Sequence, residues 1–243
     1  MTGGPQHRFM PNARSTQAIK PAPKPKIPYN AALNFAPVTM IGATSNVIVV
    51  PANSPFKTIG DLLSFARKHP GQLSFSSAGT GTSQHMGGEL LKQMAGTYIL
   101  HIPYRGSGPA VQDVIAAQVN FGIDTLVSTS AHIKSGSLRA LAVTAGKRVK
   151  GFESIPTLAE SGVPGYDVVS WQAVHAPAGT PREIVQRLQT EIAKILAQSD
   201  TRARLEAMGL EPSGMTPDEL GAFETTERAK WTKVVKDGAI KVD

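Results

Sequence analysis

The stretch LSFSSAGTGTSQHMGGE at residues 73–89 constrains the fold most, because it joins a strand pattern, a glycine-rich turn and a helix start. Apolar and small polar residues alternate over 73–77, which predicts a short strand. Gly79 and Gly81 follow within a run of small residues, and glycine tolerates the positive φ angles of a tight turn. Helical spacing begins near His85. This order predicts one unit of an α/β protein.

The start of this predicted helix is a candidate anion site. A helix N-terminus offers unpaired N–H donors and about half a positive charge, so it can bind a phosphate or a carboxylate. The spacing G-x-G-T-S-x-x-H differs from the dinucleotide fingerprint, and no Lys follows Gly81, so a nucleoside triphosphate site is not expected. The alternative is an ordinary strand-to-helix turn, in which His85 is a packing or surface residue.

Composition bounds the class of protein. A chain of 243 residues with 41% apolar residues can form one large domain or two lobes. No apolar run is long enough for a transmembrane helix. The absence of cysteine excludes disulfides, thiolate metal sites and thiol nucleophiles, and the six histidines form no H-x-x-x-H pair. The sequence therefore predicts no metal and no cofactor.

The net charge of +7 is concentrated at the start of the chain, where residues 1–30 contain five basic and no acidic residues. A basic, Pro-rich segment could bind nucleic acid, but it lacks interleaved aromatic residues and a binding motif. We therefore expect a solvated, poorly ordered arm and no nucleic-acid partner. Residues 1–15 have neither the apolar core nor the cleavage site of a signal peptide. The protein is expected to be cytoplasmic or to have its export segment outside this chain.

Helix and strand patterns alternate between residues 58 and 144, which predicts a parallel sheet with right-handed crossovers. Thr58 is a good N-cap with Asp61 at the N3 position. The predicted strands that follow lie at 73–77, 98–103, 119–123 and 138–144, and the predicted helices after Thr58 begin near His85, Ala110 and Val127.

The flanking segments are less regular. Residues 36–50 are apolar and β-branched, and they form either two strands or one long strand that crosses between lobes. After residue 144 we expect a short helix at 157–161 and a strand at 168–175. Three helices should then begin at Thr180-Pro181, Ser199 and Thr216-Pro217. With one strand in this tail, its other strands must come from 36–50 or from chain that is not present.

Several segments, in a fixed order, resemble the solute-binding proteins of tripartite tricarboxylate transporters, the Bug or TctC family. No single segment is decisive, but together they extend from about residue 15 to the end of the chain. The segments are IPYN (27–30), FAPVTMIG (35–42), SSAGTGTSQHMGGELL (76–91), HIPYRGSGPAVQDVIAAQVNFGID (101–124), HIKSGSLRALAVTAGKR (132–148), IPTLAESGVPGYDVVSW (155–171), APAGTP (176–181) and WTKVVKDGAIKVD (231–243).

The resemblance implies a two-lobed α/β architecture of the type II periplasmic-binding-protein kind, with a small ligand clamped between the lobes. It assigns 15–44 and 167–243 to the first lobe and 45–166 to the second, and it leaves 1–14 as an unmatched basic arm. The family's export signal, first strand and first glycine loop have no counterpart here. The chain thus resembles a member truncated inside its first lobe, which would then be incomplete. Within 15–30, Gln17 stands where the family usually has His.

The function that the resemblance implies is capture of a small carboxylate in the periplasm and its delivery to membrane transporter subunits. The carboxylate would be a di- or tricarboxylate, an acidic amino acid or an aromatic acid. A monomer that performs no chemistry is expected. Two alternatives remain open: a hydrolase that uses Ser83, His85 and Asp124, although no G-x-S-x-G elbow is present, and a non-functional remnant.

The candidate binding residues are those whose backbone or hydroxyl groups could hold a carboxylate, each at about 1.5–3 kcal/mol. Asp124 and Thr125 follow a predicted strand, and Asp124 could take an ammonium or hydroxyl group or could cap the next helix. Trp171 either lines the cleft or packs at a hinge, and packing is favoured. The predicted ligand-binding residues are Thr16, Ser77, Ala78, Gly79, Gly81, Thr82, Ser83, His85, Asp124 and Thr125.

Overall fold

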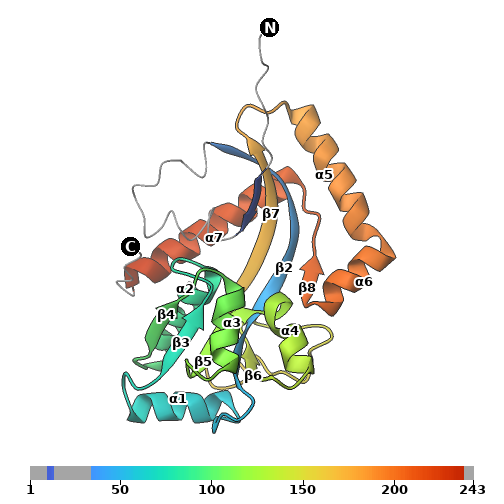
Figure 1. The fold of residues 1–243 in the computed structure, drawn as a ribbon. Coiled ribbons are helices and arrows are strands. Elements are labelled where there is room, and N and C mark those ends of the chain that lie inside the picture. Colours follow the sequence, from blue (N-terminus) through green and yellow to red (C-terminus); the bar gives the residue numbers. More distant parts are fainter. Residues whose placement is uncertain (1–9, 14–33, 238–243) are drawn as a thin grey trace.

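The computed structural model describes residues 10–13 and 34–237 (Figure 1). The strands are β1 (Met10–Ala13), β2 (Phe35–Pro51), β3 (Ser74–Ser77), β4 (Leu100–Pro103), β5 (Phe121–Thr125), β6 (Leu138–Val143), β7 (Val169–Pro177) and β8 (Leu210–Pro212). The helices are α1 (Ile59–Lys68), α2 (Ser83–Ala95), α3 (Ser107–Ile115), α4 (Leu126–Lys134), α5 (Arg182–Ala197), α6 (Ser199–Ala207) and α7 (Pro217–Asp237). The predicted mixed α/β fold is confirmed.

Strand β2 runs through the whole sheet as one strand of 17 residues, so of the two alternatives stated for 36–50 the one long strand is correct (Figure 1). Its first part pairs with β7 and β8, and its last part pairs with β5 and β6. All four ladders are antiparallel. The last residues of β2 are buried without interruption, which explains why they are apolar instead of alternating.

The part of the sheet around the end of β2, here the parallel region, contains β3, β4, β5 and β6. Strands β4, β3 and β5 are neighbours and pair in parallel. Strand β2 lies between β5 and β6 and is antiparallel to both, so β6 runs in the same direction as β5. The four strands therefore share one direction, as the alternating pattern predicts, but β2 separates β6 from the others.

The remaining part of the sheet, here the antiparallel region, contains β1, β7, β8 and the first part of β2. Two of these strands were not expected. Strand β8 has only three residues, too few for a pattern. Strand β1 lies in the segment predicted to be a poorly ordered arm, so that prediction is wrong for Met10–Ala13, which pairs with β7. The reason is that an unpaired strand edge offers backbone groups to any short extended segment.

The short helix predicted at 157–161 is also wrong, because this segment forms a single turn. Thr157 and Glu160 make reciprocal side-chain-to-backbone hydrogen bonds of 2.8 and 3.0 Å, as at a helix start. Thr157 is, however, held in a parallel bridge with Val143 of β6. Gly162 and Pro164 follow at once and prevent the turn from continuing as a helix.

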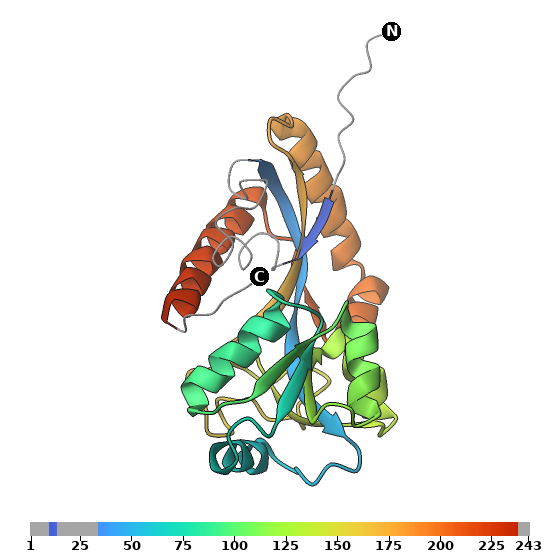
Figure 2. The ribbon, with the colours of Figure 1, turned by 60° about the vertical axis from the view of Figure 1, so that its left-hand side comes forward.

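Helices cover both faces of the sheet. Helices α1, α2 and α7 lie on one side of β2, and α3, α4, α5 and α6 lie on the other (Figures 1 and 2). The largest core cluster is on the first side and extends from Leu62 of α1 through Phe75 of β3 to Trp231 of α7. Trp171 of β7 belongs to it and is fully buried edge-on to Phe223, so it packs as favoured.

The helix starts follow the sequence signals closely. Thr58 forms a capping box with Asp61 at the start of α1, as predicted. Thr216 and Glu219 make the equivalent pair of bonds before α7. Helix α7 has 21 residues, and neither it nor any other helix of the described residues has the length and apolar character needed to cross a membrane.

Substitution of Gly88 of α2 tests how closely α2 packs against the sheet. A Cβ added there would overlap the ring of Phe75, whereas one added at the exposed Gly60 of α1 would have Thr58 Oγ1 as its nearest neighbour, at 3.6 Å. We expect Gly88→Ala to destabilise the protein by about 1–3 kcal/mol through overpacking. We expect Gly60→Ala to stabilise it by up to about 1 kcal/mol, because Ala is the better helix former. Urea unfolding of the two variants decides, and equal effects would contradict the close approach of α2.

Candidate ligand-binding site

Three helices begin at the same edge of the parallel region, because β3, β4 and β5 run in parallel and each leads into a helix. The residues before α2, α3 and α4 are Thr82, Gly106 and Thr125. The first two connections are bonded together, since the N–H of Gly106 donates to the carbonyl of Ala78 at 3.1 Å. Ligands of open α/β sheets bind at this carboxyl edge.

The glycine turn, residues 78–82, connects β3 to α2 and is closed by Thr82. The carbonyl of Gly79 accepts hydrogen bonds from Thr82 Oγ1 at 2.7 Å and from Thr82 N at 3.2 Å. Thr82 Oγ1 in turn accepts from the N–H of His85 at 3.3 Å and so caps α2. Gly79 has φ 133° and Gly81 has φ 75°, values that favour glycine.

Several backbone donors of this turn are not used. In the described part of the chain, no acceptor is hydrogen-bonded to the N–H groups of Thr80, Ser83 or Gln84. Ser83 and Gln84 are buried, although each keeps an N–H that belongs to the open first turn of α2. The hydroxyl of Ser83 donates to Gln84 Oε1 at 3.2 Å. The start of α2 therefore presents backbone N–H groups, rather than the Ser83 hydroxyl, to an acceptor.

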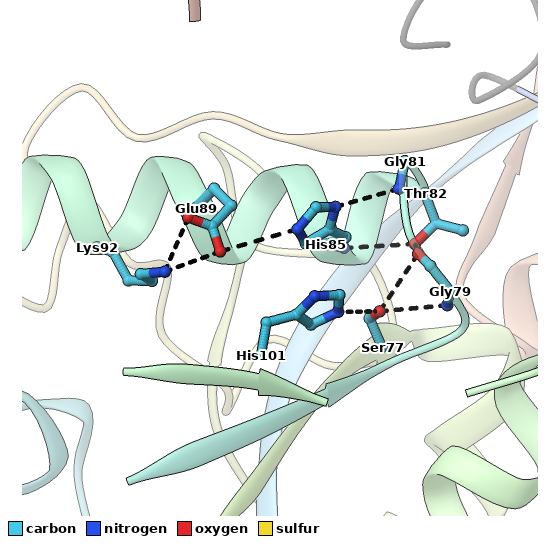
Figure 3. A network of polar contacts seen from close by, with 8 residues as sticks. All are labelled: Ser77, Gly79, Gly81, Thr82, His85, Glu89, Lys92 and His101. Carbon is cyan, nitrogen blue, oxygen red and sulfur yellow. Dashed lines mark hydrogen bonds and ion pairs between the residues drawn. The ribbon is translucent and has the colours of Figure 1, made fainter. Parts of the chain in front are cut away.

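Behind the glycine turn lies a polar network that Figure 3 shows from close by. The N–H of Gly81 donates to Nδ1 of His85 at 3.1 Å, and Nε2 of His85 lies 3.8 Å from Glu89 Oε1. The ring of His85 stacks on that of His101 of β4, with centroids 4.0 Å apart. Nε2 of His101 lies 2.7 Å from the hydroxyl of Ser77, which also accepts from the N–H of Gly79 at 3.2 Å.

Burial keeps both rings uncharged. Desolvation lowers the pKa of His85 below its ordinary 6.5, an effect that Glu89 opposes and Lys92 reinforces. Desolvation also lowers the pKa of His101 to about 3, with the neighbouring His85 and Lys92 as smaller causes. Two neutral histidines therefore lie beneath the turn at neutral pH.

Asp124, at the end of β5, connects the three helix starts. Its Oδ1 accepts from Ser107 Oγ of α3 at 2.7 Å, from the N–H of Thr125 at 2.7 Å and from Gln84 Nε2 of α2 at 3.4 Å. Its side chain is 2% exposed, and Oδ2 is buried without a partner in the described chain. Burial raises the pKa of Asp124, and the hydrogen bonds from Ser107, Thr125 and Gln84 oppose this rise.

The predicted site residues mostly lie together. Hydrogen bonds join Ser77, Gly79, Gly81, Thr82 and His85 around the glycine turn, and a second set joins Ser83 through Gln84 to Asp124. Thr125 caps α4 by accepting from the N–H of Ser128 at 3.3 Å, so Thr125 rather than Asp124 is the cap. Thr16 lies outside the described residues.

Sequence reasoning missed three residues of this arrangement. Ser107 follows a glycine at a helix start, and that signal could have identified it. Gln84 lies inside the motif but was passed over. His101 had no signal, because the pairing of β4 with β3 brings it beside Ser77.

The Ser83, His85 and Asp124 trio of the hydrolase alternative is not assembled. His85 uses Nδ1 for Gly81 and turns Nε2 toward Glu89, while Ser83 bonds to Gln84. A nucleophile requires a base within hydrogen-bond reach. In the part of the chain that the structure describes, no cluster of three His, Asp or Glu side chains could hold a metal ion.

A separate cavity of about 250 Å³ contains none of the predicted site residues. It lies where the loop after β6 meets α6 and β8, and charged side chains line it. Ion pairs cross it, from Lys147 to Glu211 at 3.5 Å and from Lys150 to Glu206 at 2.8 Å. Since these cations are paired and mostly exposed, we place the candidate site at the glycine turn.

Comparison with known proteins shows the family of the chain. A family model described as the tripartite tricarboxylate transporter family receptor, TctC, matches residues 9–240. The chain belongs to this family. The match begins inside the segment that the sequence analysis left outside the resemblance, and the predicted family is confirmed.

A curated member, the "UPF0065 protein in tcbD-tcbE intergenic region" of a Pseudomonas species, is 42% identical over 212 residues, which cover 87% of this chain and 63% of the relative. The chain therefore spans less than two thirds of that relative's length. The structure titled "R. palustris Rpa4515 with adipate" matches at 35% identity and a TM-score of 0.92, covering 96% of this chain and 78% of the other. MatC from Rhodopseudomonas palustris, "with bound malate", matches at 27% identity and a TM-score of 0.86, covering 93% and 78%. The periplasmic-binding-protein-like architecture is thereby confirmed.

Asp124 allows a test of whether its charge or its acceptor oxygen holds the three helix starts. Because Asp124→Asn keeps Oδ1, which accepts all three hydrogen bonds, we expect it to change the free energy of unfolding by less than about 1 kcal/mol at pH 7. Asp124→Ala leaves three donors without an acceptor and should cost about 2–4 kcal/mol. Urea unfolding measures both, and equal losses would mean that the charge itself is required.

The difference in stability between Asp124→Asn and the wild type depends on pH with a known sign. A carboxyl group whose pKa is raised on folding stabilises the folded state at low pH, and this contribution is lost as the pH rises from 3.8 through the folded-state pKa. Asp124→Asn has no such group. Its stability relative to the wild type should therefore increase as the pH is raised from about 3.8, and a decrease would contradict the assigned direction.

Proposed function

We propose that this chain acts as an extracytoplasmic solute-binding protein that captures a small carboxylate at the glycine turn for a tripartite tricarboxylate transporter. The observation that carries the proposal is the set of unused N–H groups at the start of α2, on the carboxyl edge of the sheet. Family membership and the relatives titled with adipate and malate support a carboxylate as the ligand.

The binding would depend on neutral donors. A carboxylate that accepts from a backbone N–H gains about 1.5–3 kcal/mol per bond, and the partial positive charge of the α2 start adds to this. A second observation, the buried amide of Asn46, supports a site at the same edge. Asn46 of β2 pairs with Thr125, its side chain is fully buried, and neither polar atom of its amide has a partner among the described residues. A polar ligand or a water would satisfy it.

The rest of the proposal follows the family. The ligand would lie between a first lobe, 15–44 with 167–243, and a second lobe, 45–166, which β2 connects, and Thr16 would contribute from the first lobe. The protein would work as a monomer in the periplasm and deliver its ligand to membrane subunits. Asp124 would organise the helix starts through Oδ1, which already accepts from three donors, and its partnerless Oδ2 would be the atom left for an ammonium or hydroxyl group of the ligand.

The binding site can be tested with a double variant at the start of α2 and a control variant at the start of α1. Thr82→Ala combined with Ser83→Ala removes the cap of α2 and loosens the donors, so we expect the dissociation constant for the preferred acid to rise tenfold or more. Thr58→Ala removes the cap of α1 in the same way but far from the turn, and it should lower stability without changing affinity. Calorimetry with adipate, malate, citrate and glutamate measures the affinity.

The outcomes separate the alternatives. Equal loss of affinity in both variants would mean that helix stability in general, not the glycine turn, governs binding. A wild-type chain that unfolds cooperatively but binds none of these acids would favour the non-functional remnant. Turnover of an ester or amide substrate, abolished by Ser83→Ala, would restore the hydrolase alternative.

A further inference from the structure

The backbone N–H of Gly81 is hydrogen-bonded to the ring of His85, and the ring can accept this bond only in its uncharged form. Gly81 is buried and left-handed, with φ 75°, and its N–H donates to Nδ1 of His85 at 3.1 Å (Figure 3). To accept this bond, Nδ1 must offer a lone pair, so Nδ1 carries no proton in this arrangement. The neutral ring then has its proton on Nε2, the atom that faces Glu89. The geometry thus specifies both the charge state and the tautomer of His85.

The bond to Gly81 determines where the donors of the turn point. Gly81 lies between Thr80 and Thr82, and the unused N–H groups of Thr80 and Ser83 are on either side of it. Gly79 is fixed independently by Thr82 and Ser77. The described structure fixes the Gly81 peptide by no other side chain. Loss of the Nδ1 acceptor would therefore free this peptide and misalign the donors.

The surroundings of His85 favour the uncharged ring. Among the described residues, the charged and titratable groups that face it are Glu89 and Lys92 on its own helix and His101 on β4, while the turn and β3 contribute none. Glu89 is paired with Lys92 at 2.8 Å, which weakens its attraction for a charged His85. The stack on His101 places the two rings in contact, so a charge on one opposes a charge on the other.

We propose that His85 is a positioning residue for the ligand, which holds the Gly81 amide through an unprotonated Nδ1 and releases the turn when it is protonated. This inference rests on the proposed function, because it assigns the control of affinity to a residue behind the same site. His85 acts through Gly81 and does not contact the ligand.

The direction of the pH effect follows. Burial lowers the pKa of His85 below 6.5, so the Gly81 bond is intact at neutral pH. As the pH falls below 6.5 and through the folded-state pKa, His85 gains a proton on Nδ1 and the acceptor is lost. Ligand affinity is expected to fall in that range, and a group whose pKa is lowered in this way also loses its contribution to stability there.

Two variants separate the acceptor from the ring. Asn in His85→Asn can place its Oδ1 near the position of Nδ1 and does not titrate, whereas Leu in His85→Leu fills the space without an acceptor. Calorimetry at pH 7.5 should show affinity for the acid that the wild type binds, for example adipate, reduced about tenfold in His85→Leu and largely recovered in His85→Asn. Thermal melts check that both variants fold.

The pH profile provides the readout that a purely structural role would not move. Adipate itself takes up protons in acid, so the ratio of the wild-type and His85→Asn dissociation constants is compared at each pH between 7.5 and 4.5. This ratio should rise as the pH falls, because only the wild type loses its acceptor. A ratio that stays constant, or wild-type affinity in His85→Leu, would overturn the proposal.

A ligand-free measurement keeps this inference separate from the proposed function. Long-range proton–nitrogen NMR of the imidazole should show the Nε2–H tautomer of His85 at pH 7.5, and the amide of Gly81 should shift with the protonation of His85. In His85→Asn the Gly81 amide should not follow this titration. If no acid binds but these signals appear, the proposed function fails while the His85–Gly81 device stands. An Nδ1–H tautomer would refute the device whatever binds.

Discussion

Backbone pairing along β2 is the constraint on which the rest of the structure depends. Among the described strands, only β2 pairs with members of both the parallel and the antiparallel regions. It passes β8 so closely at Gly42 that a Cβ there would lie 2.5 Å from the carbonyl oxygen of Glu211. Four residues further on, at Asn46, it begins to pair with β5, where its partner is Thr125. The position of the candidate site relative to the antiparallel region is thus determined by one strand.

The parallel direction of β3, β4 and β5 then decides what this site contains. It gathers three helix starts, each with unpaired N–H groups and partial positive charge, at one edge. Asp124, buried at this edge, accepts hydrogen bonds from Gln84, Ser107 and Thr125 and so joins the three helix starts. Among the described residues, the N–H groups of Ser83 and Gln84 at the start of α2 have no acceptor, and the proposed function places the anion there.

Local signals explain why much of this could be predicted from the sequence. Helix caps such as Thr58 and the glycines of the turn depend only on residues a few positions away in the sequence. The apolar run of β2 likewise indicates that this strand is buried. Features that depend on distant pairing could not be predicted. The strands β1 and β8 exist because β7 and β2 offer edges, and the stack of His85 on His101 exists because β4 pairs with β3. The helix predicted at 157–161 was wrong for the same reason, since the bridge from Thr157 to β6 overrides a good helix start.

The choice of acceptor for Gly81 has a physical logic. An Asp or Glu in place of His85 could accept the same N–H bond more strongly, but it would bring a negative charge to the base of the proposed carboxylate site. A backbone carbonyl is not available from α2, because the carbonyls of a helix point away from its N-terminus. A neutral imidazole accepts the bond without repelling an anionic ligand, and burial, which lowers the pKa of His85, favours the neutral ring. Under the proposed function, the requirement for an uncharged acceptor beside the anion site therefore accounts for a buried histidine at the first turn of α2.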